Sequence, residues 1–168
     1  VKAADLVEKI SKAPFDFFPG KRLNYSNSGY FLLGLIVEKA SGQPYAEYLQ
    51  EKVFKPLGMK NTGLHRRGFE PVGEALGYTR AGKGYRRAVD WDMSWAGGAG
   101  ALYSTVRDLD LWNEGLFALK VLNRKSLDLA FTPVKPFDES GKTFYAYGWL
   151  IARHRGLRQV GHSGGLHG

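Results

Sequence analysis

The stretch Leu23-Asn24-Tyr25-Ser26-Asn27-Ser28-Gly29-Tyr30 runs directly into the apolar segment 31–40. Residues i and i+2 of an extended segment point to the same side, so Tyr25 and Asn27 are predicted to face one ligand together, with Ser26 turned away. A phenol is a poor base at neutral pH unless a nearby cation stabilises its phenolate, whereas an asparagine amide can hold a polar substrate. The alternative is a buried tyrosine beside a helix-capping Asn or Ser, and the Tyr-x-Asn pattern alone favours that alternative.

Helices are predicted on both sides of this stretch. Residues 5–12 carry apolar side chains at helical spacing. The segment 28–40 is apolar on nearly every face, which predicts a central, buried helix with Gly42 just after its end. Another helix is predicted to begin near Pro44 and to end at about residue 54, where Pro56-Leu57-Gly58-Met59 breaks it.

The middle of the chain has a weaker pattern. Residues 61–92 are rich in Gly and Arg and predict loops with at most a short strand. The run Ala96-Gly97-Gly98-Ala99-Gly100-Ala101 lacks the Lys-Ser/Thr ending of a phosphate loop, so we expect it to serve tight backbone packing. Thr105-Val106-Arg107-Asp108 has the form of a capping box. The helix behind it is predicted to pack through Val106, Leu109, Trp112 and Leu116, and a further helix spans 124–131.

The C-terminal part of the chain has a different composition and pattern, typical of strands. Residues 144–154 are rich in aromatic and β-branched side chains, Arg155-Gly156 can turn the chain, and 157–162 can return as a partner strand. The predicted fold class is α+β or α/β: a helical subdomain with part of an antiparallel sheet. We place the helical part, with the Tyr-x-Asn element, at residues 1–135, and the hairpin part at residues 136–168.

Composition excludes few functions. The 168 residues include 43% apolar and 24% charged residues, as in ordinary globular proteins, and no apolar run approaches the ~18 residues of a membrane span. The absence of cysteine excludes disulfides and thiolate metal sites, and we expect neither a metal nor a cofactor. The formal net charge of +8 comes without a nucleic-acid-binding motif, so we interpret it as a solvated basic surface and expect no nucleic-acid partner.

The stretch Gly161-His162-Ser163-Gly164-Gly165 has the G-x-S-x-G form of a nucleophile elbow. An elbow needs a parallel strand before it and a helix after it, whereas here a predicted hairpin precedes it. We therefore reject Ser163 as an elbow nucleophile. A glycine-rich strand instead lets a substrate lie close to the backbone and accept hydrogen bonds from its N–H groups.

Four motifs occur in an order that is typical of one family. They are Pro19-Gly20 with Tyr25-Ser26-Asn27; Pro56-Leu57-Gly58-Met59 with Asn61-Thr62-Gly63; Gly97-Gly98-Ala99-Gly100 with Ser104-Thr105 and Asp108-Leu109; and His162-Ser163-Gly164. With them the chain resembles the serine β-lactamase-like family, which includes class C β-lactamases, D-alanyl-D-alanine peptidases and related esterases. The motifs are similar to its Y-x-N, P-L-G-M-x-x-T and G-G-x-x-S-T-x-x-D-L segments and to the H-x-G variant of its K-T-G triplet.

The resemblance implies a serine hydrolase that works through an acyl-enzyme, with a β-lactamase/transpeptidase-like fold. Its nucleophile would be the Ser of an S-x-x-K motif. Tyr25 would share in proton transfer beside that Lys, and the N–H of Gly165 would supply half of the oxyanion hole. Asn27 would bind the substrate's amide or the Lys. His162, Ser163 and Gly164 would bind the substrate, which is a small molecule or peptide with an ester, amide or β-lactam bond.

One departure from the family pattern shapes the prediction. No Ser in the chain is followed by Lys three residues later. In the family this motif precedes Y-x-N, so we expect the chain to be an internal fragment of a longer protein. The open sheet edges of the predicted hairpin suggest that residues 1–168 do not fold stably alone.

The function predicted is an esterase or D-amino-acid peptidase more than an efficient β-lactamase, because a neutral imidazole at His162 holds a substrate carboxylate more weakly than a Lys ammonium does. The alternative is a catalytically inactive family member that acts as a binding or scaffold protein. The compartment does not follow from the residues; the resemblance favours the periplasm or secretion over the cytoplasm. The oligomeric state is not predicted.

Overall fold

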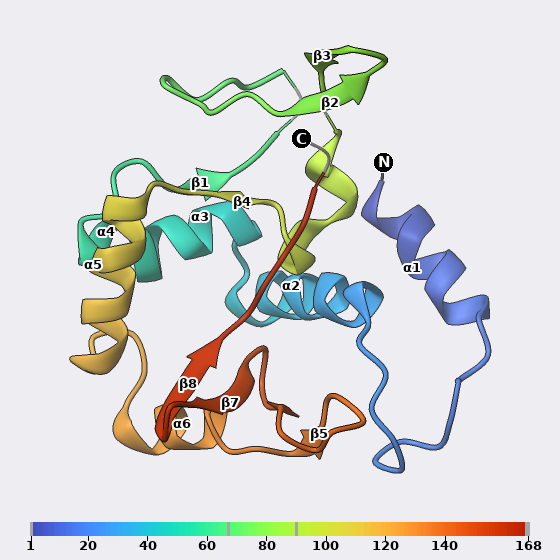
Figure 1. Ribbon diagram of the computed structural model, residues 1–168, viewed down its shortest axis with the longest axis vertical. Coiled ribbons are helices and arrows are strands. Elements are labelled where there is room, and N and C mark those ends of the chain that lie inside the picture. The colour runs from blue at the N-terminus through green and yellow to red at the C-terminus, as the bar shows by residue number, and fades with distance from the viewer. Residues whose placement is uncertain (1, 67, 90, 167–168) are drawn as a thin grey trace.

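The helix that follows the Tyr25 stretch, α2 (Asn27–Ser41), crosses the centre of the molecule (Figure 1). Its N-terminus is capped by Ser26, whose side-chain oxygen accepts a hydrogen bond from the Gly29 N–H at 3.2 Å. Gly42, at φ 70°, ends it in the left-handed conformation, as predicted. This computed structural model describes residues 2–66, 68–89 and 91–166.

The prediction that α2 is buried on nearly every face is wrong for the described chain. Phe31 and Gly34 are buried, but Leu33 is 51% exposed and Ile36 is 59% exposed. Within the described residues, α2 packs mainly against the short 3-10 helix η3 (Gly97–Ala99) and α3 (Tyr45–Leu49). Its exposed apolar side chains have no comparable packing partner among these residues. An apolar sequence predicts burial only where another element is present to cover it.

The glycine run packs its backbone against α2, as predicted. A β-carbon added at Gly98 would lie 2.6 Å from the Tyr30 carbonyl oxygen and 3.2 Å from the Gly34 Cα. No side chain fits in that space, so a glycine at each contact position lets the two backbones touch.

The helix after α2 is longer than predicted. α3 continues through a π-helical turn, η1 (Gln50–Phe54), into α4 (Lys55–Leu57), and ends at Gly58 with φ 76°. Pro56 therefore lies inside the helix that it was expected to break. A proline disturbs the helical turn before it, and the wider π-turn is located at that place.

The helix α5 (Val106–Phe117) begins as the capping box predicts, because Thr105 Oγ1 accepts a hydrogen bond from the Asp108 N–H at 3.2 Å. The Asp108 carboxylate, only 3% exposed, instead accepts hydrogen bonds from the Asn61 N–H and the Thr62 hydroxyl, each at 2.7 Å. It thereby ties α5 to the loop after α4.

The predicted packing face of α5 is only half correct. Leu116 is buried and Trp112 packs against it, whereas Val106 is 85% exposed and Leu109 is 50% exposed. Val106 stands in the first turn, beyond the reach of the core cluster around Leu116.

The described residues also form three antiparallel sheets. β1 (Gly63–Leu64) pairs with β4 (Leu102–Tyr103), and β2 (Tyr78–Ala81) pairs with β3 (Gly84–Arg87). The β2–β3 hairpin lies in the region predicted as loops. All its residues are exposed, so the sequence lacks the alternation of apolar and polar residues by which a half-buried strand is predicted. The short 3-10 helix η2 (Met93–Trp95) follows it.

The third sheet has the order β5 (Lys135–Pro136), β6 (Phe144–Tyr145), β7 (Leu150–His154) and β8 (Leu157–Gly161). The predicted hairpin is confirmed for β7 and β8, which pair from Leu150 with Gly161 to His154 with Leu157. Its first strand is shorter than the predicted 144–154, because the chain turns between β6 and β7, which pair antiparallel with each other. Arg155 and Gly156 form the turn at φ 50° and 81°. The proposed boundary between residues 135 and 136 falls within β5 and stays a prediction.

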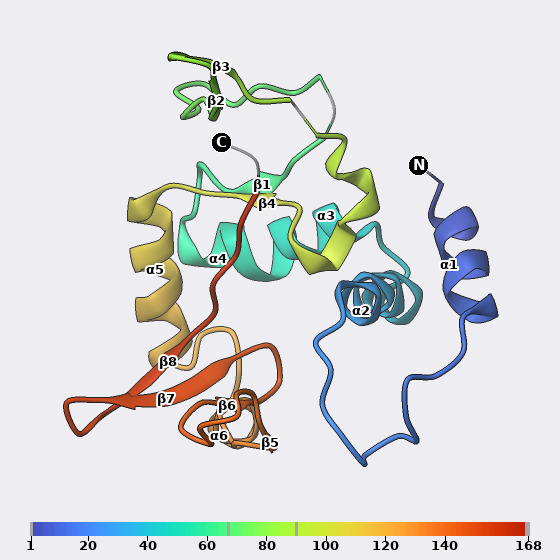
Figure 2. The same ribbon diagram turned by 45° about the vertical axis from the view of Figure 1, so that its right-hand side comes forward.

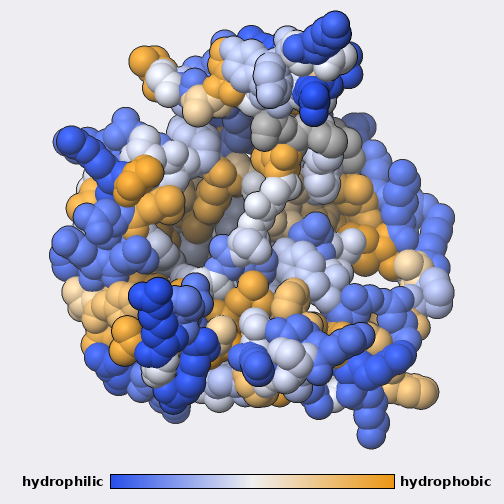
Figure 3. Space-filling view, viewed as in Figure 1, coloured by the Kyte–Doolittle hydropathy of each residue, from blue (hydrophilic) through white to orange (hydrophobic). Residues whose placement is uncertain are grey.

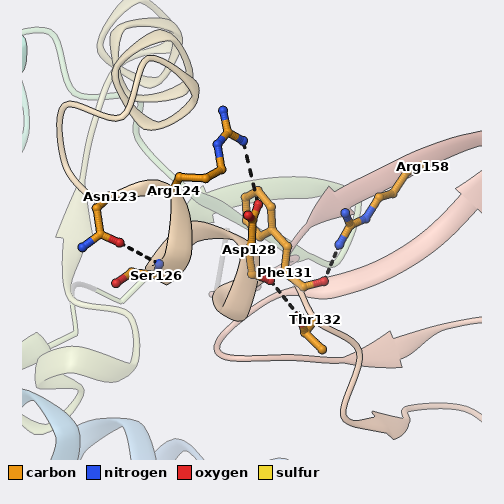
Figure 4. A network of polar contacts seen from close by, with 7 residues as sticks. All are labelled: Asn123, Arg124, Ser126, Asp128, Phe131, Thr132 and Arg158. Atoms are coloured by element: carbon orange, nitrogen blue, oxygen red, sulfur yellow. Dashed lines mark hydrogen bonds and ion pairs between the residues drawn. The ribbon is translucent and has the colours of Figure 1, made fainter.

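Helix α6 (Arg124–Ala130) supports this sheet. Asn123 caps it by accepting from the Ser126 N–H at 2.8 Å, and the Arg158 guanidinium on β8 donates to the Phe131 carbonyl at its C-terminal end (Figure 4). Leu116, Leu127, Phe131, Ala146 and Ile151 form the core cluster between α5, α6 and the sheet. The N-terminal helix α1 (Ala3–Lys12) stands apart at the edge of the molecule (Figure 2) and buries none of its residues.

No helix in the described part of the chain is both long enough and apolar enough to span a membrane.

Candidate active site

A groove runs between the start of α2, the segment around η2 and η3, and the segment that follows β8. That last segment crosses the face of the molecule in Figure 1, and Figure 3 shows the face hollowed beside it. The groove has a volume of ≈ 1000 Å³, at the upper end of the range for small-molecule sites. Its lining includes all six predicted site residues: Tyr25, Asn27, His162, Ser163, Gly164 and Gly165.

Tyr25 and His162 meet across this groove. Their ring centroids lie 5.6 Å apart with the rings tilted by 40°, although 136 positions separate them in the sequence (162 − 25 − 1). Tyr25 is 38% exposed, so it is not the buried tyrosine of the alternative interpretation. Ser26 does cap α2, with its side chain bonded to the Gly29 N–H, and this leaves Tyr25 and Asn27 to line the groove.

The glycine-rich segment after β8 lies open to the groove. A β-carbon added at Gly164 or at Gly165 would have no neighbour within 4 Å, so the backbone at both positions is accessible to a ligand. At His162, Nδ1 lies 2.6 Å from the Ser163 carbonyl oxygen. The strand that precedes this segment is antiparallel and belongs to a hairpin, which agrees with the rejection of a nucleophile elbow at Ser163.

Sequence reasoning missed the residues behind the Tyr25–His162 pair. The Tyr145 hydroxyl on β6 donates a hydrogen bond to the Tyr30 oxygen at 2.9 Å and lies 3.3 Å from His162 Nε2. Phe137 stacks on the other side of Tyr145 with ring centroids 5.6 Å apart. Tyr145 was recognised only as one aromatic residue of a strand, and no pattern in one sequence shows that the sheet order β6-β7-β8 brings it beside His162.

The electrostatics of the groove are simple. Burial, and secondly the hydrogen bond to Tyr30, raise the pKa of Tyr145 well above the usual value for a phenol, so its hydroxyl stays protonated at any working pH. No lysine or arginine is found among the described residues that line the groove. These residues therefore do not supply the cation that a tyrosine needs to act as a base.

The described residues contain no group of three or more His, Asp or Glu side chains placed to hold a metal ion. Several side chains that line the groove are instead aromatic or apolar: Trp91 and Trp95 near η2, Phe137 directly after β5, and Leu150 on β7. The arrangement is therefore suited to an organic ligand held by ring contacts and by backbone N–H groups.

Comparison with known proteins gives the class. The fold matches a D-stereospecific amidohydrolase from Streptomyces sp. with a TM-score of 0.89 and 28% identity, over 100% of this chain and 51% of that one. It also matches a D-amino acid amidase from Ochrobactrum anthropi, solved with L-phenylalanine amide, with a TM-score of 0.82 and 31% identity, over 96% and 48% of the two chains. Penicillin-binding protein 4* of Bacillus subtilis is 30% identical over 167 residues, which cover 90% of this chain and 36% of that protein.

The fold is therefore the one shared by penicillin-binding proteins and D-amino acid amidases. The Beta-lactamase family model matches residues 1–168, and the chain belongs to this family. The chain spans between about a third and half of the length of the relatives named above.

Proposed function

We propose that the protein is a serine hydrolase that cleaves amide or ester bonds of D-amino-acid compounds through an acyl-enzyme. The observation that carries this proposal is that Tyr25 and the open segment 162–165, which follows β8, line one groove of a beta-lactamase-family fold, with the Tyr25 and His162 rings in contact. Residues 1–168 would then form the substrate-facing side of the site, opposite the nucleophile.

In this proposal Tyr25 transfers a proton during acylation. Its hydroxyl needs a cationic partner, and none lines the groove among the described residues, so the partner is the Lys of an S-x-x-K motif outside residues 1–168. The Ser of that motif is the nucleophile. The Gly165 N–H donates to the oxyanion that forms on the substrate carbonyl, and such a donor is worth roughly 10²–10³ in rate.

The remaining predicted residues hold the substrate. Asn27 has an amide with both donor and acceptor groups at the start of α2, and the open backbone at Ser163 and Gly164 can pair with the substrate as a neighbouring strand would. The apolar lining residues Trp95, Phe137 and Leu150 can contact a hydrophobic side chain of the substrate. The printed names of two neighbours, a D-amino acid amidase and a D-stereospecific amidohydrolase, support a D-configured substrate.

His162 supports amide, ester or peptide hydrolysis over efficient β-lactam hydrolysis, because it lacks the ammonium that would hold a substrate carboxylate. Penicillin-binding relatives also support a location outside the cytoplasm. The alternative, an inactive binding or scaffold protein, would be favoured if the complete reading frame contained no S-x-x-K motif.

The test uses the protein expressed from its complete reading frame. We expect it to hydrolyse D-phenylalanine amide and a D-phenylalanine ester in preference to the L-enantiomers, and to turn over a chromogenic cephalosporin far more slowly. Chiral chromatography of the products measures the first, and absorbance measures the second. A protein that binds D-phenylalanine amide but releases no product would establish the binding alternative.

A further inference from the structure

The roles proposed above leave a buried tyrosine without a function. Tyr145 is 8% exposed, and its hydroxyl stands between two polar groups: the Tyr30 oxygen at 2.9 Å and His162 Nε2 at 3.3 Å. On the far side of the imidazole, Nδ1 lies 2.6 Å from the Ser163 carbonyl oxygen. Four residues from α2, β6 and the segment after β8 therefore form one hydrogen-bonded chain.

The atoms fix the direction of one of these bonds, the one to the Ser163 carbonyl. A carbonyl oxygen only accepts, so His162 Nδ1 carries a hydrogen. Tyr145 donates its single proton to Tyr30, and in that arrangement its oxygen receives a hydrogen from Nε2, as a charged imidazolium requires. If the Tyr145 hydroxyl turns to Nε2, it serves the neutral ring that bears its hydrogen on Nδ1. One hydroxyl thus satisfies His162 in both charge states.

The same contacts set the position of Tyr25. Its ring centroid lies 5.9 Å from that of Tyr145, edge to face, and 5.6 Å from that of His162. Tyr145 and His162 are themselves edge to face at 5.8 Å, with 84° between their planes. A rotation of the imidazole would therefore move the surface against which Tyr25 packs.

We propose that Tyr145 is a positioning residue that holds the His162 ring through Nε2 and, through that ring, aligns Tyr25. This inference rests on the proposed function. Because both ring nitrogens are occupied by protein atoms, His162 offers the substrate its ring and not a hydrogen bond. The part of the substrate beside it is then an uncharged group, such as a carboxamide or an ester, and not a carboxylate.

The first test needs no turnover. The complete protein is compared with Tyr145→Phe and with Tyr147→Phe, the latter at a 63% exposed tyrosine two positions away. Long-range ¹H–¹⁵N spectra report the His162 ring nitrogens at a pH at which those spectra show the ring to be neutral. We expect Nδ1 to be protonated in the unmodified protein. The Nε2 resonance should shift in Tyr145→Phe, which removes its partner, and should stay in place in Tyr147→Phe.

The second test measures kinetics on two matched substrates, D-phenylalanine amide and D-phenylalanyl-glycine, which places a carboxylate on the leaving group. We expect Tyr145→Phe to lower kcat for the amide about 10- to 100-fold, the cost of misplaced catalytic groups, with little change in KM. The preference for the amide over the carboxylate substrate should shrink, because Nε2 loses its bond to Tyr145 and can then donate a hydrogen bond to the substrate carboxylate. Tyr147→Phe should leave both rates unchanged.

A second variant covers the case in which Tyr145→Phe does not fold. Tyr30→Phe removes the acceptor of the Tyr145 proton and leaves the Tyr145–His162 contact in place. The Tyr145 hydroxyl then has only Nε2 as an acceptor, so the Nε2 resonance should shift as expected for a nitrogen that accepts a stronger hydrogen bond. If Nε2 is unmoved in every variant, or if the two Tyr→Phe variants at 145 and 147 give the same substrate preference, the positioning role is wrong. Absence of all hydrolysis in the unmodified protein would instead overturn the proposed function. The spectra need no turnover, so they would still test the positioning role.

Discussion

The chemistry proposed for the groove depends most on one hydroxyl group, that of Tyr25. The side chain is 38% exposed and is surrounded by the rings of Tyr30, Tyr145 and His162, with centroid distances of 5.6–6.0 Å. These ring contacts hold the side chain in place without its hydroxyl. A role in packing and a role in proton transfer can therefore be separated by removing the oxygen alone.

In the complete protein, Tyr25→Phe should lower kcat by roughly 10²–10⁴ with little change in the melting temperature. A lost neutral hydrogen bond to the substrate would cost much less, about 0.5–1.5 kcal/mol. Steady-state kinetics on ester and amide substrates and a thermal melt measure both quantities. Tyr78→Phe, at an exposed tyrosine of the β2–β3 hairpin, is the matched control. Activity within a few-fold of the unmodified protein would make Tyr25 a packing residue only.

At the scale of elements, the groove depends on how closely η3 approaches α2. Gly98 and Gly34 allow this contact, and the rest of the α2–η3 interface places the start of α2 beside the segment that holds Trp95 and Ala96. Gly97 stands at φ 47°, and a β-carbon added there would lie 2.9 Å from the Phe31 ring, so two successive positions exclude a side chain. The close contact between α2 and η3 is therefore possible because these positions lack side chains, and apolar character does not explain it.

Gly98→Ala should therefore reduce the free energy of unfolding by about 2–3 kcal/mol, because the added methyl group meets backbone atoms that cannot rotate away. Its β-carbon would lie 2.6 Å from the Tyr30 carbonyl oxygen, in the helix that carries the site. Denaturant unfolding of the complete protein measures the loss. Gly84→Ala is the control, since a β-carbon there has nothing within 4 Å. Equal stability of the two variants would show that the α2–η3 contact is looser than described.

Local sequence patterns predicted the elements well wherever backbone chemistry determines them. Thr105 caps α5, Gly42 ends α2, and Arg155-Gly156 turns the hairpin. The patterns failed where the outcome depends on distant neighbours. Pro56 is accommodated by a π-turn, and the β2–β3 hairpin has no buried face to mark it.

The candidate site divides in the same way. Tyr25, Asn27 and the segment 162–165 were found because their motifs resemble those of a family, and the structure brings them to one groove. The order and spacing of the motifs carried that prediction, since Tyr25 alone favoured a structural role. Tyr145 was not found because its place beside His162 arises from the sheet order β6-β7-β8. No local motif records such an order.

At the scale of the molecule, the described chain shows apolar surface and open edges together. Leu33 and Ile36 on α2 and Val106 on α5 are exposed, and β8 stands at the end of the order of its sheet. An unpaired strand of this kind usually invites pairing or is covered. The groove is likewise incomplete. It holds the proposed proton-transfer and substrate-binding residues, but no serine in residues 1–168 is followed three positions later by the Lys that would activate it as a nucleophile.

The incomplete groove predicts where a covalent inhibitor binds. In the protein expressed from its complete reading frame, a serine-directed phosphonate should label one serine stoichiometrically, and peptide mass spectrometry should locate it outside residues 1–168. The reason is chemical: a serine hydroxyl is a weak nucleophile without an adjacent base, and Ser26 uses its oxygen to cap α2. Labelling should be slower in Tyr25→Phe and unaffected in Tyr78→Phe. Stoichiometric labelling of Ser163 would restore that residue as a nucleophile and overturn the assignment of its segment to substrate binding.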